Sequence, residues 1–187
     1  MEFSLEEKKI LIRLARLSIE EKLFDIEKVI EFDVVKYPNL KSKCGVFVTL
    51  TMSGELRGCI GYITSDDPLY QTIHEAAEHA AFEDPRFYPL TEDEYENIEV
   101  EISVLSEAFP MKSYDEIELG KHGLILEEKG RRGLLLPQVP IEHGMNKEQY
   151  LDAICRKTGA PQDLWRKKLL NISLFTALVF SEKDLEE

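Results

Sequence analysis

The segment Leu56–Gly61, which reads LRGCIG, is the clearest candidate for chemistry in this chain. Glycine inside a strand costs backbone entropy and packs nothing, so Gly58 and Gly61 indicate a bulge or a close approach to the backbone. Cys59, between them, is the candidate nucleophile or redox thiol. Residues two apart share a face of a strand, so Arg57 is its candidate electrostatic partner unless Gly58 bulges. The alternative is a buried cysteine beside glycines that let a helix pack closely.

A histidine between glycines is the candidate general base. His122 stands in Gly120–Gly123, just before a predicted strand, and a loop of this kind can present an imidazole to a substrate. If His122 met Cys59 in space, a thiol–imidazole pair would form. The alternative is a turn that carries an exposed histidine. Cys59, Arg57 and His122 are therefore the catalytic candidates.

Arginines supply the candidate binding side chains. Arg86, in Asp84-Pro85-Arg86-Phe87, could reach an anionic ligand, or could tether a turn to a carboxylate while Phe87 is buried. Arg131 and Arg132 stand with Lys129 at a predicted hairpin tip. They could hold a phosphate or carboxylate, or form a solvated turn that resists aggregation. The binding candidates are Leu56, Gly58, Ile60, Gly61, Arg86, Arg131 and Arg132.

The remaining histidines do not predict a metal site. His74 and His79 are five apart, about 140° around a helix, whereas two ligands on one face need a spacing of four. The predicted partners are surface pairs four apart, His74 with Glu78 and Glu75 with His79. His143 lies in a loop, and the sequence shows no partner for it.

Composition limits the class of protein. The 187 residues include 43% hydrophobic and 32% charged side chains, which is enough apolar material for a core. No apolar stretch approaches the ~20 residues of a membrane span, and the amino terminus does not resemble a secretion signal. Three scattered cysteines favour a reducing cytoplasm over a disulfide scaffold. The net charge of −13 opposes binding to a nucleic-acid backbone.

Capping and periodicity predict the helices. Ser4 and Glu7 form a capping box that opens a helix over 5–23. Asp67 is expected to cap a second helix with Pro68 at its first position, and Asp84-Pro85 to end it. A further capping box begins at Thr91, and 147–157 is predicted to be an amphipathic helix that Gly159 and Pro161 close.

Alternation and turn signals predict the strands. These cover 45–52, 56–63, 98–106, 123–127, 133–136 and 171–180, with a turn at Ser53-Gly54 and a hairpin around 129–132. Hairpins as well as helices join the strands, so we expect an α+β fold with a mostly antiparallel sheet flanked by helices. A length of 187 residues suits a single domain over 1–187, alone or with a small lobe packed on the main sheet.

Several segments together resemble the AMMECR domain family. They are LRGCIG at 56–61, DPRF at 84–87 with Pro89-Leu90, ISVLS at 102–106, HGL at 122–124 and GRRGLLLPQV at 130–139. They occur in the family's order over about 46–180. The resemblance implies an α+β fold with an antiparallel sheet, flanking helices and a small second lobe. It also implies association with a Memo-like protein and a radical S-adenosylmethionine protein, in a pathway whose product it does not indicate.

Two functional hypotheses follow. In the first, the chain is a component of that pathway and Cys59 is its reactive thiol. In the second, the chain is a non-catalytic module that binds a protein or a small anion through Leu56–Gly61 and Lys129–Arg132. The sequence shows no complete catalytic constellation, which favours the second hypothesis, whereas the glycine-flanked thiol favours the first. The sequence therefore leaves open whether the chain is an enzyme. It predicts no cofactor and no membrane partner.

Overall fold

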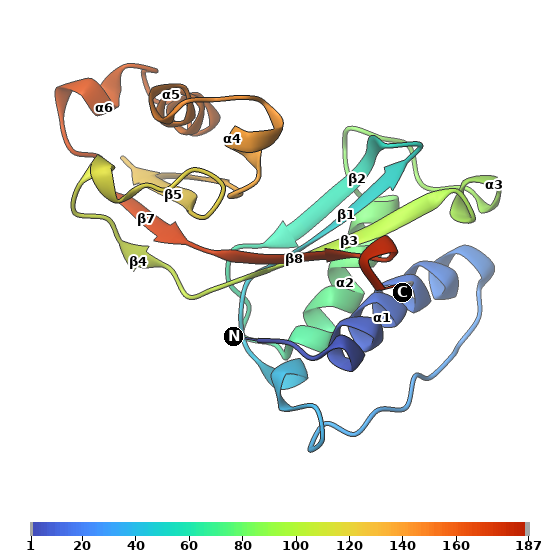
Figure 1. The fold of residues 1–187 in the computed structure, drawn as a ribbon. Coiled ribbons are helices and arrows are strands. Elements are labelled where there is room, and N and C mark those ends of the chain that lie inside the picture. The colour runs from blue at the N-terminus through green and yellow to red at the C-terminus, as the bar shows by residue number, and fades with distance from the viewer. Residues whose placement is uncertain (1, 186–187) are drawn as a thin grey trace. The chain divides into compact units, whose positions relative to one another are not determined.

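The computed structural model describes residues 2–185, and these divide into two compact units. Among the described residues, unit 1 comprises 2–104 and 178–185, and unit 2 comprises 105–177. Each unit has an antiparallel four-stranded sheet and its own hydrophobic core (Figure 1). The predicted α+β class with antiparallel strands and flanking helices is thus confirmed, although the strands form two sheets where one was expected. The single domain remains a prediction.

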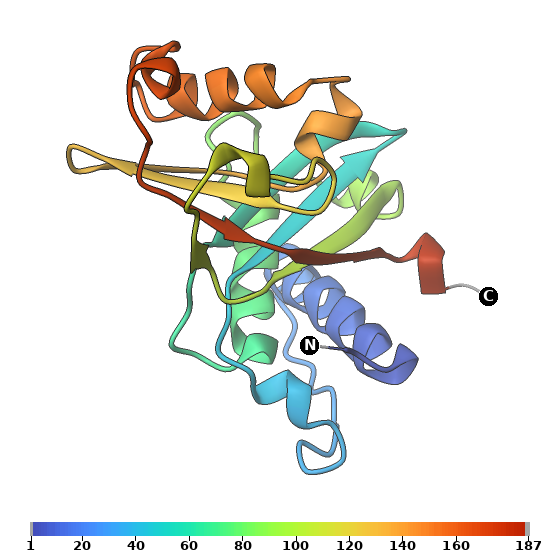
Figure 2. The ribbon, with the colours of Figure 1, turned by 60° about the vertical axis from the view of Figure 1, so that its left-hand side comes forward.

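Unit 1 is a sheet in the order β2-β1-β3-β8 with helices along one face. Its strands are β1 (Val46–Met52), β2 (Glu55–Tyr62), β3 (Ile98–Leu105) and β8 (Ala177–Ser181). Its helices are α1 (Leu5–Phe24), α2 (Leu69–Phe82) and α3 (Glu92–Tyr95), with 3₁₀ turns at Pro38–Lys41 and Lys183–Leu185. In both views α1 and α2 run together along the same face (Figures 1 and 2). The apolar stripe of α2, which includes Ile73, Ala77 and Ala80, is buried there.

Unit 2 is a smaller sheet in the order β4-β7-β5-β6. Its strands are β4 (Phe109–Pro110), β5 (Gly123–Glu128), β6 (Arg131–Leu135) and β7 (Ile172–Phe175). Its helices are α4 (Val139–Glu142), α5 (Lys147–Lys157) and α6 (Leu164–Lys167), with a 3₁₀ turn at Tyr114–Glu116. Helix α5 packs on β5 and β6, and its buried side chains, such as Tyr150 and Ile154, join the core of this unit.

Local signals predicted the starts of α1, α3 and α5. Ser4 and Glu7 form the reciprocal capping box of α1, and Thr91 and Glu94 form that of α3. The start of α2 was predicted wrongly, because Pro68 is its N-cap and the Asp67 side chain makes no capping bond. The first N–H of α2, from Leu69, is satisfied instead by the carbonyl oxygen of Ser42 at 2.9 Å.

The predicted strand over 171–180 is also wrong in part. The segment forms two strands, β7 and β8, that belong to different sheets. They separate at Thr176, whose carbonyl oxygen accepts from the Ser106 N–H at 2.8 Å and whose N–H donates to the Ser106 hydroxyl at 2.9 Å. One apolar run therefore contributes to both cores, which a pattern of alternation alone does not reveal.

Candidate functional site

The hairpin of β1 and β2 contains a bulge that positions Cys59. Met52 lies opposite Glu55 and Thr51 lies opposite Leu56. Beyond that point, Leu50 lies opposite Gly58 and Thr49 lies opposite Cys59. Arg57 is thus the extra residue on β2. A regular hairpin would place Thr49 opposite Gly58. The bulge instead brings the Thr49 hydroxyl 3.3 Å from Cys59 Sγ, where it donates a hydrogen bond.

Gly58 and Cys59 point to opposite faces of the sheet. A Cβ on Gly58 would lie 2.1 Å from the Ala80 carbonyl oxygen, so Gly58 lies directly against the backbone of α2. Neighbouring residues on a strand alternate in direction. The Cys59 side chain therefore points away from α2, and it is half-buried. The close-packing interpretation holds for Gly58, whereas Cys59 is not one of the fully buried residues.

The turn after α2 covers the edge of strand β2 at Cys59. The Cys59 N–H donates to Asp84 Oδ2 at 2.9 Å, and Arg86 Nη2 lies 3.5 Å from the Cys59 carbonyl oxygen. Arg86 also donates to both oxygens of Asp84, at 2.9 and 2.6 Å. The tethered-turn interpretation of Arg86 is confirmed, although Phe87 is half-buried rather than buried. The LRGCIG and DPRF segments form one hydrogen-bonded unit.

Arg86, and not Arg57, is the arginine that the structure brings to Cys59. The pKa of Arg86 is raised, first by its hydrogen bond to Asp84 and in smaller part by the charge that Cys59 can carry. The Arg57 guanidinium donates to both oxygens of Glu94, at 2.9 and 2.8 Å, and to the Tyr88 carbonyl oxygen at 3.0 Å. Arg57 was expected to share a face of the strand with Cys59 unless the strand bulged at Gly58. The strand bulges at Arg57, so the regular alternation on which that expectation depended does not apply.

His122 is buried in unit 2, in contrast to the exposed turn that was the alternative interpretation. It is 7% exposed, and its Nδ1 lies 3.2 Å from the Glu118 nitrogen and 3.1 Å from the Glu116 carbonyl oxygen. Its ring meets the edge of Phe109. Because His122 and Cys59 belong to different units, the structure provides no basis for pairing them.

The other predicted binding residues are divided between the units. Leu56 is 41% exposed, Ile60 packs on the core of unit 1, and a Cβ on Gly61 would lie 2.2 Å from the Val46 carbonyl oxygen. In unit 2, Arg131 Nη1 donates to the Gly159 carbonyl oxygen at 2.6 Å, and Arg132 is exposed.

The histidines of α2 pair differently from the prediction. His74 Nε2 lies 2.8 Å from Glu21 of α1, not beside Glu78. Glu75 accepts from the Tyr62 hydroxyl, which also contacts His79 Nδ1 at 3.0 Å. Both predicted pairs are wrong, because His74 pairs with Glu21 of α1 and His79 lies beside Tyr62 and 3.7 Å from Glu83 at the end of α2. Within residues 2–185, no group of three or more His, Cys, Asp or Glu side chains gathers closely enough to hold a metal ion.

The environment of Asp84 predicts a dependence of stability on pH. Its side chain is buried, and its hydrogen bonds from Arg86 and the Cys59 N–H lower its pKa to about 2. A lowered pKa stabilises the fold above the unfolded value near 4, and this contribution disappears as the pH falls toward 2. Unfolding in urea from pH 7 to pH 2 should show a loss of about 2 kcal/mol from this residue.

The variant Asp84→Asn separates the contribution of Asp84 to the free energy of unfolding from the contributions of other carboxylates. At pH 7 it should have a lower free energy of unfolding than the parent, and the difference should shrink between pH 4 and pH 2. Asp66→Asn is the matched control, because Asp66 is exposed in the loop before α2. Equal acid profiles for Asp84→Asn and the parent would contradict the assignment.

Comparison with known proteins identifies the family of this chain. The AMMECR1 family model matches residues 12–180, and the chain belongs to that family. Protein MJ0810 of Methanocaldococcus jannaschii is 41% identical over 188 residues, covering 96% of this chain and 92% of that protein. Protein MK0488 of Methanopyrus kandleri is 42% identical over 192 residues, covering 98% and 92%.

A solved structure has the same fold. The crystal structure of uncharacterized protein PH0010 from Pyrococcus horikoshii matches with a TM-score of 0.85 and 38% identity, covering 98% of this chain and 94% of that one. The resemblance inferred from LRGCIG and the accompanying segments is therefore confirmed. Among the described residues, no helix is both long and apolar enough to cross a membrane.

Proposed function

We propose that this AMMECR1 protein is a thiol-dependent component of a pathway that includes a Memo-like protein and a radical S-adenosylmethionine protein. Cys59 is its nucleophile or redox thiol. The observation that supports this role most directly is the hydrogen bond from the Thr49 hydroxyl to Cys59 Sγ at 3.3 Å. A donor aimed at sulfur favours the thiolate over the thiol, and the thiolate is the reactive form.

The surroundings of Cys59 support a fixed thiol. Its backbone is held on both sides, by β1 through the ladder and by Asp84 and Arg86 at the outer edge. A nucleophile acts efficiently when its position is set before the substrate arrives. Arg86, whose side chain is 54% exposed, is paired with Asp84 beside Cys59, and the exposed part of its guanidinium can contact an incoming anion. The proposal places the protein in the cytoplasm, where thiols stay reduced.

Alkylation of the folded protein tests the proposal. Iodoacetamide should modify Cys59 with a pH midpoint below the ~8.5 of an ordinary thiol, and mass spectrometry can follow each cysteine separately. Cys44 is the internal control, because burial raises the pKa of its half-buried thiol. At pH 7 we expect Cys59 to react about tenfold faster than Cys44. The variant Thr49→Val, which removes the donor, should slow Cys59 and leave Cys44 unchanged.

The outcomes separate the two functional hypotheses. If Cys59 reacts no faster than Cys44, or only after denaturation, the thiol is structural and the catalytic role fails. If the reaction of the assembled pathway, measured with the Memo-like and radical proteins present, is lost in Cys59→Ser, then the thiol is required for function as well as being reactive. Retention of full turnover in that variant would exclude a catalytic thiol.

The second candidate function is a module that binds a protein or a small anion. The observation that favours it is the hairpin turn between β5 and β6, where Lys129 and Arg131 line a pocket of about 300 Å³ with Gly159. The Arg132 side chain, exposed on β6, makes no hydrogen bond or ion pair with residues 2–185. A shift in melting temperature with inorganic phosphate that is lost in Lys129→Gln would support this function, and an equal shift in that variant would exclude it.

A further inference from the structure

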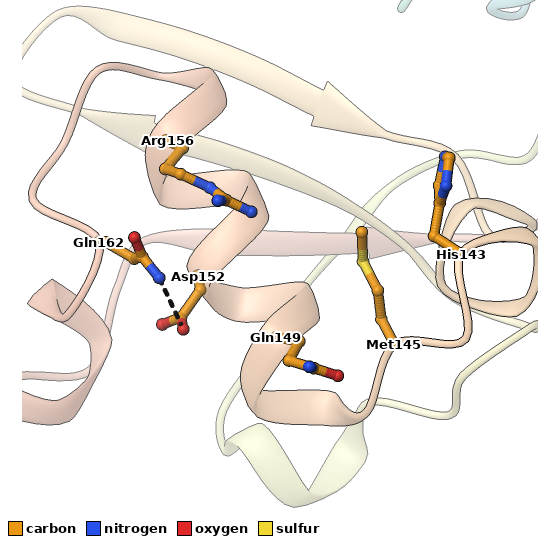
Figure 3. A pocket seen from close by; sticks show the side chains of 6 residues that line it. All are labelled: His143, Met145, Gln149, Asp152, Arg156 and Gln162. Carbon is orange, nitrogen blue, oxygen red and sulfur yellow. Dashed lines mark hydrogen bonds between the residues drawn. The ribbon is translucent and has the colours of Figure 1, made fainter.

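A second pocket lies entirely within unit 2, between α5 and the loop that precedes it. Its volume is about 400 Å³, within the range of small-molecule sites. The lining residues are His143, Met145, Gln149, Asp152, Arg156 and Gln162 (Figure 3). None of them is among the candidate residues of the proposed function.

The side chains in this pocket divide into two groups. Arg156 and Gln149 extend from α5 toward Met145 and His143, whereas Asp152 is turned toward Gln162 (Figure 3). Asp152 accepts from Trp165 Nε1 at 2.7 Å and from Gln162 Nε2 at 3.0 Å, so each of its oxygens already has a donor. These two bonds, the Trp165 bond first, lower the pKa of Asp152, and the charges of Arg166 and then Arg156 add to the effect.

Arg156 and His143 offer donors that nothing else in unit 2 uses. Arg156 is exposed, and its guanidinium forms no hydrogen bond or salt bridge with residues 2–185. The imidazole of His143 likewise has no hydrogen-bond partner in this part of the chain. By contrast, Arg166 nearby in the sequence is paired with Glu148 at 2.9 Å. In a chain of net charge −13, an arginine inside a pocket whose guanidinium forms no ion pair at hydrogen-bonding distance has donors available to a ligand.

We propose that this pocket binds a small organic anion. The carboxylate or phosphate group accepts hydrogen bonds from the Arg156 guanidinium, and the His143 imidazole lies at the opposite side of the same pocket (Figure 3). The Gln149 amide adds a donor, and the thioether of Met145 offers an apolar contact for the carbon skeleton. Asp152 does not repel the anion strongly, because its oxygens point to Trp165 and Gln162.

Side-chain NMR titration tests the proposal with two defined probes. Inorganic phosphate and succinate are added separately to the ¹⁵N-labelled protein, which distinguishes a phosphate ligand from a carboxylate. Binding at this pocket should shift the Arg156 Nε–H and Gln149 amide signals in a saturable manner. Arg156→Gln should weaken the affinity about tenfold, as expected for a lost charge-assisted hydrogen bond.

Two control variants distinguish binding at this pocket from a general effect of removing positive charge. Arg13→Gln makes the same change of charge at an exposed arginine of unit 1 and should leave the affinity unchanged. Arg132→Gln should also leave it unchanged, which separates this pocket from the hairpin. Binding should survive in Cys59→Ser, so failure of the thiol proposal does not affect this one. No saturable shift with either probe, or equal affinity in Arg156→Gln and the parent, would overturn the inference.

Discussion

Replacing Gly58 by alanine should lower the free energy of unfolding by about 3 kcal/mol. The added Cβ would lie 2.1 Å from the Ala80 carbonyl oxygen and 3.1 Å from the carbonyl carbon. Both atoms belong to the backbone of α2, and Ala80 is only 1% exposed, so no flexible side chain can move aside. Either α2 must separate from the sheet or β2 must shift, and both changes disturb the core of unit 1. Urea unfolding followed by circular dichroism measures the loss.

Gly54→Ala is the matched control for this prediction. Gly54 has a φ of +84° in the turn between β1 and β2, and no atom lies within 4 Å of its Cβ position. The cost there is conformational only, about 1 kcal/mol. If Gly58→Ala were no more destabilising than Gly54→Ala, the close approach of α2 to β2 would be disproved. Confirmation would mean that one glycine of LRGCIG is required for packing, whatever Cys59 does.

Glu94→Gln should destabilise the protein by about 3 kcal/mol at pH 7. Arg57 is 9% exposed, and Glu94 supplies the only carboxylate that it contacts among the described residues. Removing that charge leaves a buried guanidinium without compensation. The hydrogen bonds from Arg57, together with those from Thr91, lower the pKa of Glu94 to about 2 despite partial burial. The carboxylate is therefore ionised throughout the neutral range, and the loss should be measurable by urea unfolding.

A double-mutant cycle isolates this pair. Arg57→Met and Glu94→Gln should each be destabilising, and the double variant should lose less than the sum of the two. Glu92→Gln, at an exposed position in the same helical turn, serves as the control for charge. Additive losses would show that the two residues act independently. The same Arg57→Met protein should alkylate at Cys59 at the parent rate, because the Arg57 guanidinium is bound to Glu94 and to the Tyr88 carbonyl oxygen rather than to that thiol.

The sequence by itself determined the elements whose signals are local. The capping boxes at Ser4 and Thr91 and the amphipathic pattern over 147–157 predicted helices that the structure confirms. The two glycine-containing turns predicted both hairpins. Each of these features depends on residues a few positions apart, so their hydrogen bonds and side-chain periodicity are encoded in a single short segment. Family membership was also evident from short segments in a fixed order.

Tertiary structure decided which side chains meet at the candidate site. The bulge at Arg57 shifts the register by one residue, which pairs Thr49 with Cys59 and directs Arg57 to Glu94. A bulge of this kind depends on how β2 fits against α2 and on a carboxylate from α3, both distant in sequence. The pocket beside α5 was equally hidden. His143 had no partner in the sequence, and only the folding of its loop beside α5 brings it to the same cavity as Arg156.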